Sequence, residues 1–205
     1  MRYKELSELN REIQATREPG DRGRYAPVIN MLSPTQRILI ISSDPSLDTD
    51  KSGETLAKHS DFEERVIALF FLGRDGDDEV RAIREKYATY KKSFLDRCYW
   101  THFSKTYSAG HPGRFWADRF LRKEIELFEP EVIVVFGGVV ADFLLGRAPL
   151  RSRVNRELRW NRIPVICTLH PSKDWNLRRP AEFDFYPTWS LIRSVCALQL
   201  QDHSI

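Results

Sequence analysis

Cysteine is scarce in this sequence. Its 205 residues include three cysteines, Cys98, Cys167 and Cys196, and no two of them form a C-x-x-C pair. Disulfide-stapled domains and zinc sites need more numerous, regularly spaced cysteines. The sequence therefore indicates neither a disulfide framework nor a zinc site, and we interpret the three as reduced, mostly structural thiols.

Long hydrophobic runs are also missing. The apolar run at residues 132–146 is interrupted by glycines and an aspartate, well short of the roughly 20 residues that span a bilayer. The start, MRYKELSELNREIQ, is too charged for a signal peptide. We expect a monomer without membrane contact in the cytoplasm, with the nucleus as the alternative location. With 41% hydrophobic residues it can bury one core, so we expect a single domain over 1–205, with 1–30 as an N-terminal helical extension.

Two common enzyme motifs are absent. The chain has no G-x-G-x-x-G and no P-loop, which argues against a nucleotide-binding, flavodoxin-like protein. A hydrolase built on Ser43 and His170 is a further alternative, but Ser43 is not framed as a G-x-S-x-G elbow.

Positive charge is concentrated near the C-terminal part of the chain. The net charge is +3, yet residues 151–180 carry eight basic and two acidic side chains. Such a patch is typical of a partner rich in phosphate, and it is equally compatible with a solvated basic face.

Apolar strand-like segments alternate with helical patterns along the chain. We predict strands at 37–42, 98–104, 131–137 and 163–169, and helices at 1–17, 61–73, 77–96, 114–130, 138–146 and 186–200. Strands separated by helices favour a three-layer α/β/α sandwich around a central, mainly parallel four-stranded sheet.

Polar loops follow three of these strands. They read SSDPSLDTDKSG, THFSKTYSAGHPGR and HPSKDWNLRR, whereas the third strand ends at Gly137 and Gly138. In an open parallel sheet the ligand site lies outside the carboxyl ends of the strands. Any one loop can be a simple turn, but three together predict a site at this edge.

Four segments carry a family resemblance. They are SSDPSLDTDKSGETL (42–56), YWTHFSK (99–105), RKEIELFEPEVIVVFGGVVADFLLG (122–146) and LHPSKDWN (169–176). In this order the chain resembles the uracil-DNA glycosylase superfamily over about residues 37–200, most closely its iron–sulfur branch, family 4. The segment near 57–95 lies outside the resemblance.

The resemblance implies two catalytic residues. His170 matches the histidine that supports the leaving uracil anion, a role that a neutral imidazole N–H can fill. Asp44 takes the place of the aspartate that orients water and stabilises the sugar cation in the classical enzymes, while Ser43 stands where family 4 carries its carboxylate. A strand-end histidine and an Asx-turn are the structural alternatives for His170 and Asp44.

The base-binding positions depart from the family pattern. Besides Ser43, they are His102, where the family has the asparagine that reads uracil, and Leu56, where family 4 has a stacking phenylalanine; Phe62 or Trp100 could substitute for that ring. The cluster cysteines are missing as well, with Thr106 in one of their places. We therefore expect no iron–sulfur cluster and no cofactor.

The resemblance also implies DNA contacts. Ser42 and Ser172 would bond phosphate oxygens, and a wedge residue, Trp175 or Leu177, would fill the gap left by the base; a core role for Trp175 is the alternative. Further positive charge for the DNA backbone would come from Lys105, Lys173, Arg178 and Arg179.

These expectations combine into one function. We predict a monofunctional DNA glycosylase that flips uracil or a related deaminated base out of DNA and hydrolyses its N-glycosidic bond, with no lysine placed for a lyase step. Two alternatives remain: a DNA-binding module of the same fold with little chemistry, and a protein that forms a covalent DNA adduct through His102.

Overall fold

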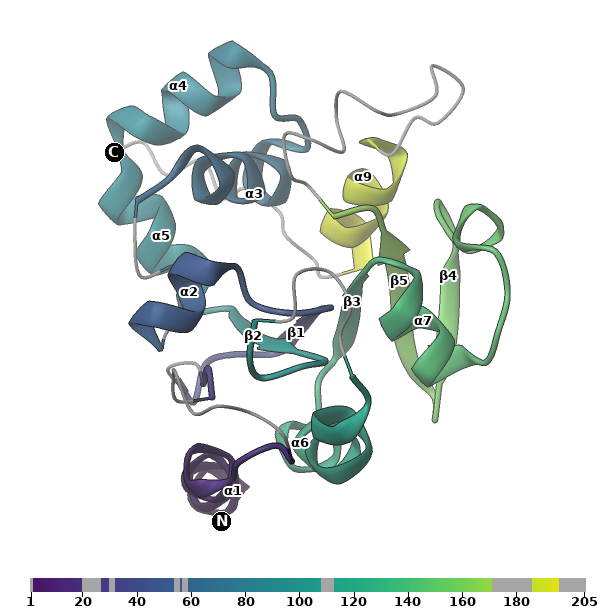
Figure 1. Ribbon diagram of the computed structural model, residues 1–205. Coiled ribbons are helices and arrows are strands. Elements are labelled where there is room, and N and C mark those ends of the chain that lie inside the picture. The colour runs from purple at the N-terminus through teal and green to yellow at the C-terminus, as the bar shows by residue number, and fades with distance from the viewer. Residues whose placement is uncertain are drawn as a thin grey trace.

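A five-stranded, mostly parallel sheet forms the centre of the molecule (Figure 1). The computed structural model describes residues 2–19, 27–29, 32–53, 56, 59–107, 113–170 and 186–195. The strand order is β2-β1-β3-β5-β4, with bounds β1 Ile38–Ser42, β2 Cys98–His102, β3 Val132–Phe136, β4 Glu157–Trp160 and β5 Ile163–Thr168. The predicted α/β fold with a mainly parallel sheet is confirmed.

The prediction of four strands missed β4. This strand runs antiparallel to β5 at the sheet edge and is joined to it by Asn161 and Arg162, whose φ angles are 47° and 74°. Two positive φ angles are typical of the two-residue turn that closes a tight hairpin. The signal was weak because β4 reads ELRW, with charged residues that suit an exposed edge but not the apolar pattern of a buried strand.

Helices cover both faces of the sheet. One face carries α3 (Asp61–Leu72), α4 (Asp77–Glu85), α5 (Tyr87–Leu95) and α9 (Tyr186–Val195). The other face carries the π-helix η1 (Ala117–Leu121), α6 (Arg122–Phe128) and α7 (Gly138–Leu145), with α1 (Arg2–Ala15) packed outside η1 and α6 (Figure 1). A short 3-10 helix, η2 (Leu150–Ser152), follows α7.

Two helical predictions are corrected. The single helix expected at 77–96 is two helices, because Lys86 leaves helical geometry at φ −125° and ψ 33°. The polar loop after β1 contains a helix, α2 (Leu47–Ser52), whose first turn is capped by the Ser46 hydroxyl and whose end is set by Gly53 at φ 75°. Among the described residues, no helix is long and apolar enough to cross a membrane.

Burial on both faces explains where polar groups can lie. Ile38 and Ile40 of β1 face the α3 side, whereas Leu39 and Ile41 face the α6 side. Every residue of β1, β2 and β3 is buried, as expected for parallel strands between two helical layers. Polar side chains are therefore concentrated where the strands end.

We expect Ile13→Ala to lower the free energy of unfolding by about 2–5 kcal/mol, because Ile13 is fully buried between α1 and η1 and its truncation leaves a cavity. Urea denaturation followed by circular dichroism measures this. The neighbouring exposed Arg11→Ala is the control and should change stability by no more than about 0.5 kcal/mol. Equal values for the two variants would contradict the packing of α1 described above.

Candidate active site

The carboxyl ends of β1 and β2 are joined by backbone hydrogen bonds. Ser42 and His102 are partners in the parallel register. Beyond them the Phe103 amide donates to the Ser42 carbonyl at 2.8 Å, and the Ser104 amide donates to the Ser43 carbonyl at 2.8 Å. The first two sequence-predicted loops therefore leave the sheet side by side.

Asp44 and His170 are brought together at this edge from distant parts of the chain. Asp44 follows β1 and accepts a hydrogen bond from Ser43 Oγ at 3.0 Å. His170 follows β5 and is half-buried. Burial lowers the pKa of His170 to about 4, while the nearby charge of Asp44 raises it and offsets part of this effect. His170 is therefore neutral at pH 7 and can donate through an N–H group.

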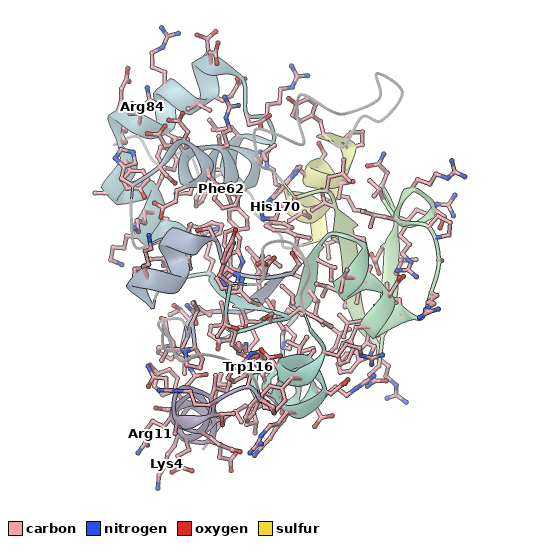
Figure 2. All side chains as sticks on the ribbon, viewed as in Figure 1. Lys4, Arg11, Phe62, Arg84, Trp116 and His170 are labelled. Carbon is pink, nitrogen blue, oxygen red and sulfur yellow. The ribbon has the colours of Figure 1, made fainter. Side chains whose placement is uncertain are left out.

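Aromatic rings surround His170. Phe62, at the start of α3, stacks on the imidazole with ring centroids 5.1 Å apart and an interplanar angle of 5° (Figure 2). Phe136, at the end of β3, meets it edge-on at 5.8 Å. Phe62 also lies 6.1 Å from Trp100, centroid to centroid. These contacts hold the imidazole plane in one orientation and place an aromatic face next to it.

His102 lies deeper at the same edge. Its side chain is buried, and its Nδ1 is 2.7 Å from Ser42 Oγ, which also accepts a hydrogen bond from Trp100 Nε1 at 3.0 Å. Burial lowers the pKa of His102 well below its ordinary value, and the positive charge of Lys105 adds to this effect, as does that of His170 once His170 is protonated. This edge thus combines one carboxylate with two neutral imidazoles.

The predicted stacking position differs from the expectation. Leu56 is 4% exposed and packs into the core beneath α3, with its carbonyl accepting a hydrogen bond from Lys91. Its side chain therefore offers little surface to a base. Phe62, one of the two substitutes that the sequence analysis named, instead lies beside His170.

Lys105 does not lie where a DNA phosphate could reach it. Its ammonium is 1% exposed and pairs with Glu124 Oε2 at 2.7 Å, while Glu124 Oε1 accepts hydrogen bonds from the Tyr99 and Thr101 hydroxyls at 2.6 and 2.9 Å. The predicted DNA contact is corrected to a buried ion pair. The sequence analysis missed Glu124. The available signal was its position four residues after Phe120 and four before Phe128, which puts a carboxylate on the same helix face as two aromatic residues.

Ser42 is similarly internal. Its side chain is buried and its hydroxyl lies between Trp100 and His102, so it holds the site from within and does not face a phosphate.

The other predicted DNA contacts, namely Ser172, Lys173, Trp175, Leu177, Arg178 and Arg179, lie outside the described residues. In the described part of the basic segment, Arg151, Arg156 and Arg162 are exposed. Arg153 is buried and pairs with Asp142 at 2.9 Å, so it contributes to the fold and not to a surface patch.

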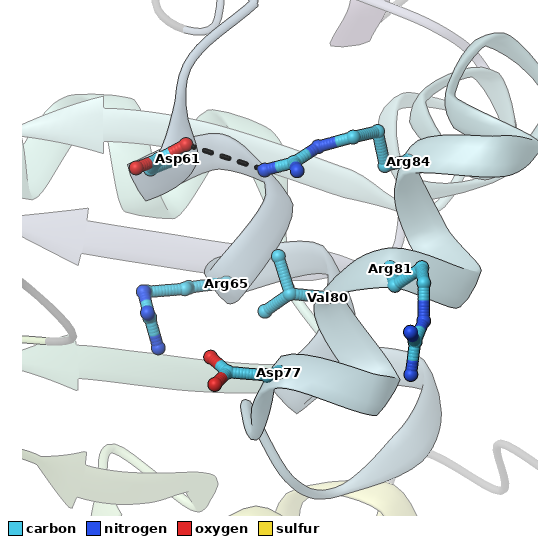
Figure 3. A pocket seen from close by; sticks show the side chains of 6 residues that line it. All are labelled: Asp61, Arg65, Asp77, Val80, Arg81 and Arg84. Carbon is cyan, nitrogen blue, oxygen red and sulfur yellow. Dashed lines mark hydrogen bonds and ion pairs between the residues drawn. The ribbon is translucent and has the colours of Figure 1, made fainter.

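A charged groove of about 310 Å³ lies between α3 and α4 (Figure 3). Its lining residues are Asp61, Arg65, Asp77, Val80, Arg81 and Arg84. Each of the three arginines has a side-chain nitrogen within 3.6 Å of a carboxylate oxygen. The partners of Arg65, Arg81 and Arg84 are Asp75, Asp78 and Glu64, respectively. Within the described ranges, no group of three or more His, Cys, Asp or Glu side chains is placed to hold a metal ion.

Fold and candidate site together define an open α/β protein in which a carboxylate and a neutral histidine lie near each other at the carboxyl ends of parallel strands. The family comparison agrees with this class. The model of the uracil DNA glycosylase superfamily matches residues 29–186. The chain belongs to this superfamily, and its membership supports a glycosylase-type, DNA-directed function.

We expect Lys105→Ala to cost about 3–5 kcal/mol of stability, because it leaves the Glu124 carboxylate buried without its cation. The double variant Lys105→Met with Glu124→Leu should lose less than this single variant, since no unpaired charge remains. Chemical denaturation measures both. The adjacent exposed Lys123→Ala should shift stability by no more than about 0.5 kcal/mol; a double variant less stable than Lys105→Ala would contradict the assignment.

The lowered pKa of His170 predicts a pH-dependent loss of stability. Between pH 6.5 and about 4 the unfolded chain protonates this histidine and the folded chain does not, so stability falls as pH falls through this window. His170→Gln stays neutral throughout. The stability difference between wild type and this variant should therefore shrink from pH 7 to pH 4, as measured by denaturation at each pH; parallel curves would show that His170 titrates normally.

Proposed function

We propose that this protein is a monofunctional DNA glycosylase that hydrolyses the N-glycosidic bond of uracil or a related deaminated base. The observation that carries the proposal is that Asp44 lies near enough to a neutral His170 for its charge to act on this histidine, at the strand ends of a protein of this superfamily. Its role would be base excision repair.

The chemistry needs two charges to be stabilised at once. As the bond between C1′ and the base nitrogen breaks, the sugar becomes cation-like and the base carries away the electron pair. Asp44 would face the sugar and orient the water that attacks C1′. His170 would donate an N–H hydrogen bond to the base oxygen where negative charge develops, with no proton transfer required.

The base would be flipped out of the duplex to reach this edge. Phe62 offers the aromatic face, and His102 and Ser43 offer polar contacts to the base edge. Unstacking costs a few kcal/mol, roughly, which such contacts offset.

The DNA backbone would follow the basic segment. Arg151, Arg156 and Arg162 are exposed, and we propose that Ser172, Lys173, Arg178 and Arg179 add contacts to phosphates while Trp175 or Leu177 fills the gap in the duplex. We also propose that residues 1–205 act as one domain in a monomeric cytoplasmic protein, since α1 packs on η1 through a shared apolar cluster.

Two other functions are favoured by particular residues. The absence of a carboxylate at Ser43 and of an asparagine at position 102 favours a binding module with weak chemistry. The lowered pKa of His102 leaves it a neutral nucleophile near His170, which favours an adduct in which a His102 ring nitrogen bonds to C1′, the base leaves with its electron pair, and the ring loses its other N–H proton.

The test uses labelled single- and double-stranded oligonucleotides that contain one uracil, hypoxanthine or xanthine, with alkali cleavage to reveal abasic sites. We expect multiple turnovers by the wild type, a loss of about 10²–10⁴-fold in Asp44→Asn and of about 10²–10³-fold in His170→Ala. The exposed Asp78→Asn on α4 is the matched control and should retain activity.

Other outcomes assign the alternatives. DNA binding without product or adduct identifies the binding module. A stoichiometric species that survives a denaturing gel, and that disappears in His102→Ala, identifies the adduct. Full activity in both Asp44→Asn and His170→Ala would overturn the site.

A further inference from the structure

Phe62 connects the helical segment from α3 to α5 with His170. It is the second residue of α3 and stacks on the imidazole, with ring centroids 5.1 Å apart and an interplanar angle of 5° (Figure 2). Helices α3, α4 and α5 carry none of the four segments that resemble the superfamily. The position of this ring is therefore set by contacts outside the family motifs.

Two buried carboxylates directly follow Phe62. The side chains of Glu63 and Glu64 are 4% and 2% exposed. A buried carboxylate is costly unless charged or hydrogen-bonding groups surround it. The place of the first turn of α3 therefore depends on the partners of both carboxylates.

Helix α4 supplies the main partner of Glu64. Arg84 Nε donates to Glu64 Oε1 at 3.0 Å and Arg84 Nη2 donates to Oε2 at 2.7 Å, which makes the pairing bidentate. His59 Nε2 lies 2.5 Å from the same Oε1. The hydrogen bonds from Arg84 lower the pKa of Glu64 although burial opposes this. Glu64 is therefore ionised at neutral pH and fixed to α4.

Helix α5 supplies the partners of Glu63. The Tyr87 hydroxyl donates to Glu63 Oε2, and Lys91 Nζ lies 3.7 Å from the same oxygen. The Tyr87 ring also stacks on His59, with ring centroids 3.9 Å apart. Helix α5 thus holds the chain on both sides of Phe62.

The hydrogen bond between Tyr87 and Glu63 does not depend on the charge of Glu63. Burial raises the pKa of Glu63 to about 7, although the nearby Lys91 ammonium opposes this effect. A protonated carboxyl keeps an oxygen that can accept, so the Tyr87 hydroxyl can donate to either form. The contact between α3 and α5 therefore persists across neutral pH.

We propose that Tyr87 and Arg84 are positioning residues that hold the start of α3, and with it the aromatic cover of His170, in place. Without their hydrogen bonds the first turn of α3 moves, water reaches the imidazole face that Phe62 covers, and the imidazole loses its fixed orientation. The effect on catalysis rests on the glycosylase function proposed above. The effect on His170 itself does not.

This effect is carried by packing and not by charge. Among the described residues, the charged or titratable groups that interact with His170 are Asp44, after β1, and His102, at the end of β2. Neither comes from α4 or α5. A variant of Arg84 or Tyr87 therefore changes the pKa of His170 only by moving the residues packed on it.

The pKa of His170 is the direct measurement. NMR titration follows the imidazole 1H–13C signals, and His170→Gln identifies the signal among the five histidines. We expect a pKa of about 4 in the wild type. It should rise by about 1 or more in Phe62→Ala and by at least about 0.5 in Tyr87→Phe and Arg84→Ala, because hydration favours the charged imidazole. Tyr87→Phe keeps the ring and removes only the hydroxyl.

Each variant has a matched control. Tyr90→Phe also removes a hydroxyl from α5, but this hydroxyl has no hydrogen-bond partner in the part of the chain that the structure describes. Arg81→Ala also removes an arginine from α4, and the partner of Arg81 is the exposed Asp78. Both controls should leave the pKa of His170 as in the wild type. If folded Tyr87→Phe lowers the melting temperature and leaves this pKa unchanged, Tyr87 serves the fold alone and the proposal is overturned.

Activity on uracil-containing oligonucleotides distinguishes failure of this proposal from failure of the function. We expect kcat to fall about tenfold in Tyr87→Phe and to be unchanged in Tyr90→Phe, because a misplaced group slows the chemical step. If the wild type releases no base, the glycosylase function fails, whereas the titration still decides the position of the cover. If the wild type is active and Tyr87→Phe changes neither kcat nor the pKa of His170, the function stands and the positioning is overturned.

Discussion

The hydroxyl of Ser42 links the strands that carry this site, and much of the arrangement depends on its two hydrogen bonds. The sheet is covered on both faces, so a polar group inside it must find its partner among neighbouring strands. Ser42 meets this constraint by accepting from Trp100 and contacting His102. The result is a histidine of defined orientation inside an otherwise apolar layer.

Desolvation then gives the two histidines their chemical character. Neither His102 nor His170 is protonated at neutral pH, because burial lowers both pKa values. A neutral imidazole can donate one hydrogen bond through its N–H and accept one at its other nitrogen. The charge of Asp44 acts in the opposite direction and raises the pKa of His170.

A second polar network supports the site from the opposite face of the sheet. Lys105 and Glu124 form a buried ion pair, and the Tyr99 hydroxyl, 2.6 Å from Glu124, is also 3.4 Å from Asn10 of α1. This network joins the end of β2 to α6 and α1. The ion pair between Lys105 and Glu124 thus fixes the loop that follows His102 to α6, and α1 takes part in the network through Asn10.

The sequence by itself determined the parallel core strands and the family, and it singled out Asp44 and His170 as candidate site residues. These are local signals: an apolar run such as that of β3 is buried wherever it lies, and Asp44 and His170 directly follow strands. Only the tertiary structure decided the rest. Lys105 and Ser42 look like surface contacts until their partners, Glu124 and Trp100, are known, and the contact of Phe62 with His170 joins residues 108 positions apart. Such roles depend on contacts between residues distant in sequence, which composition and spacing do not encode.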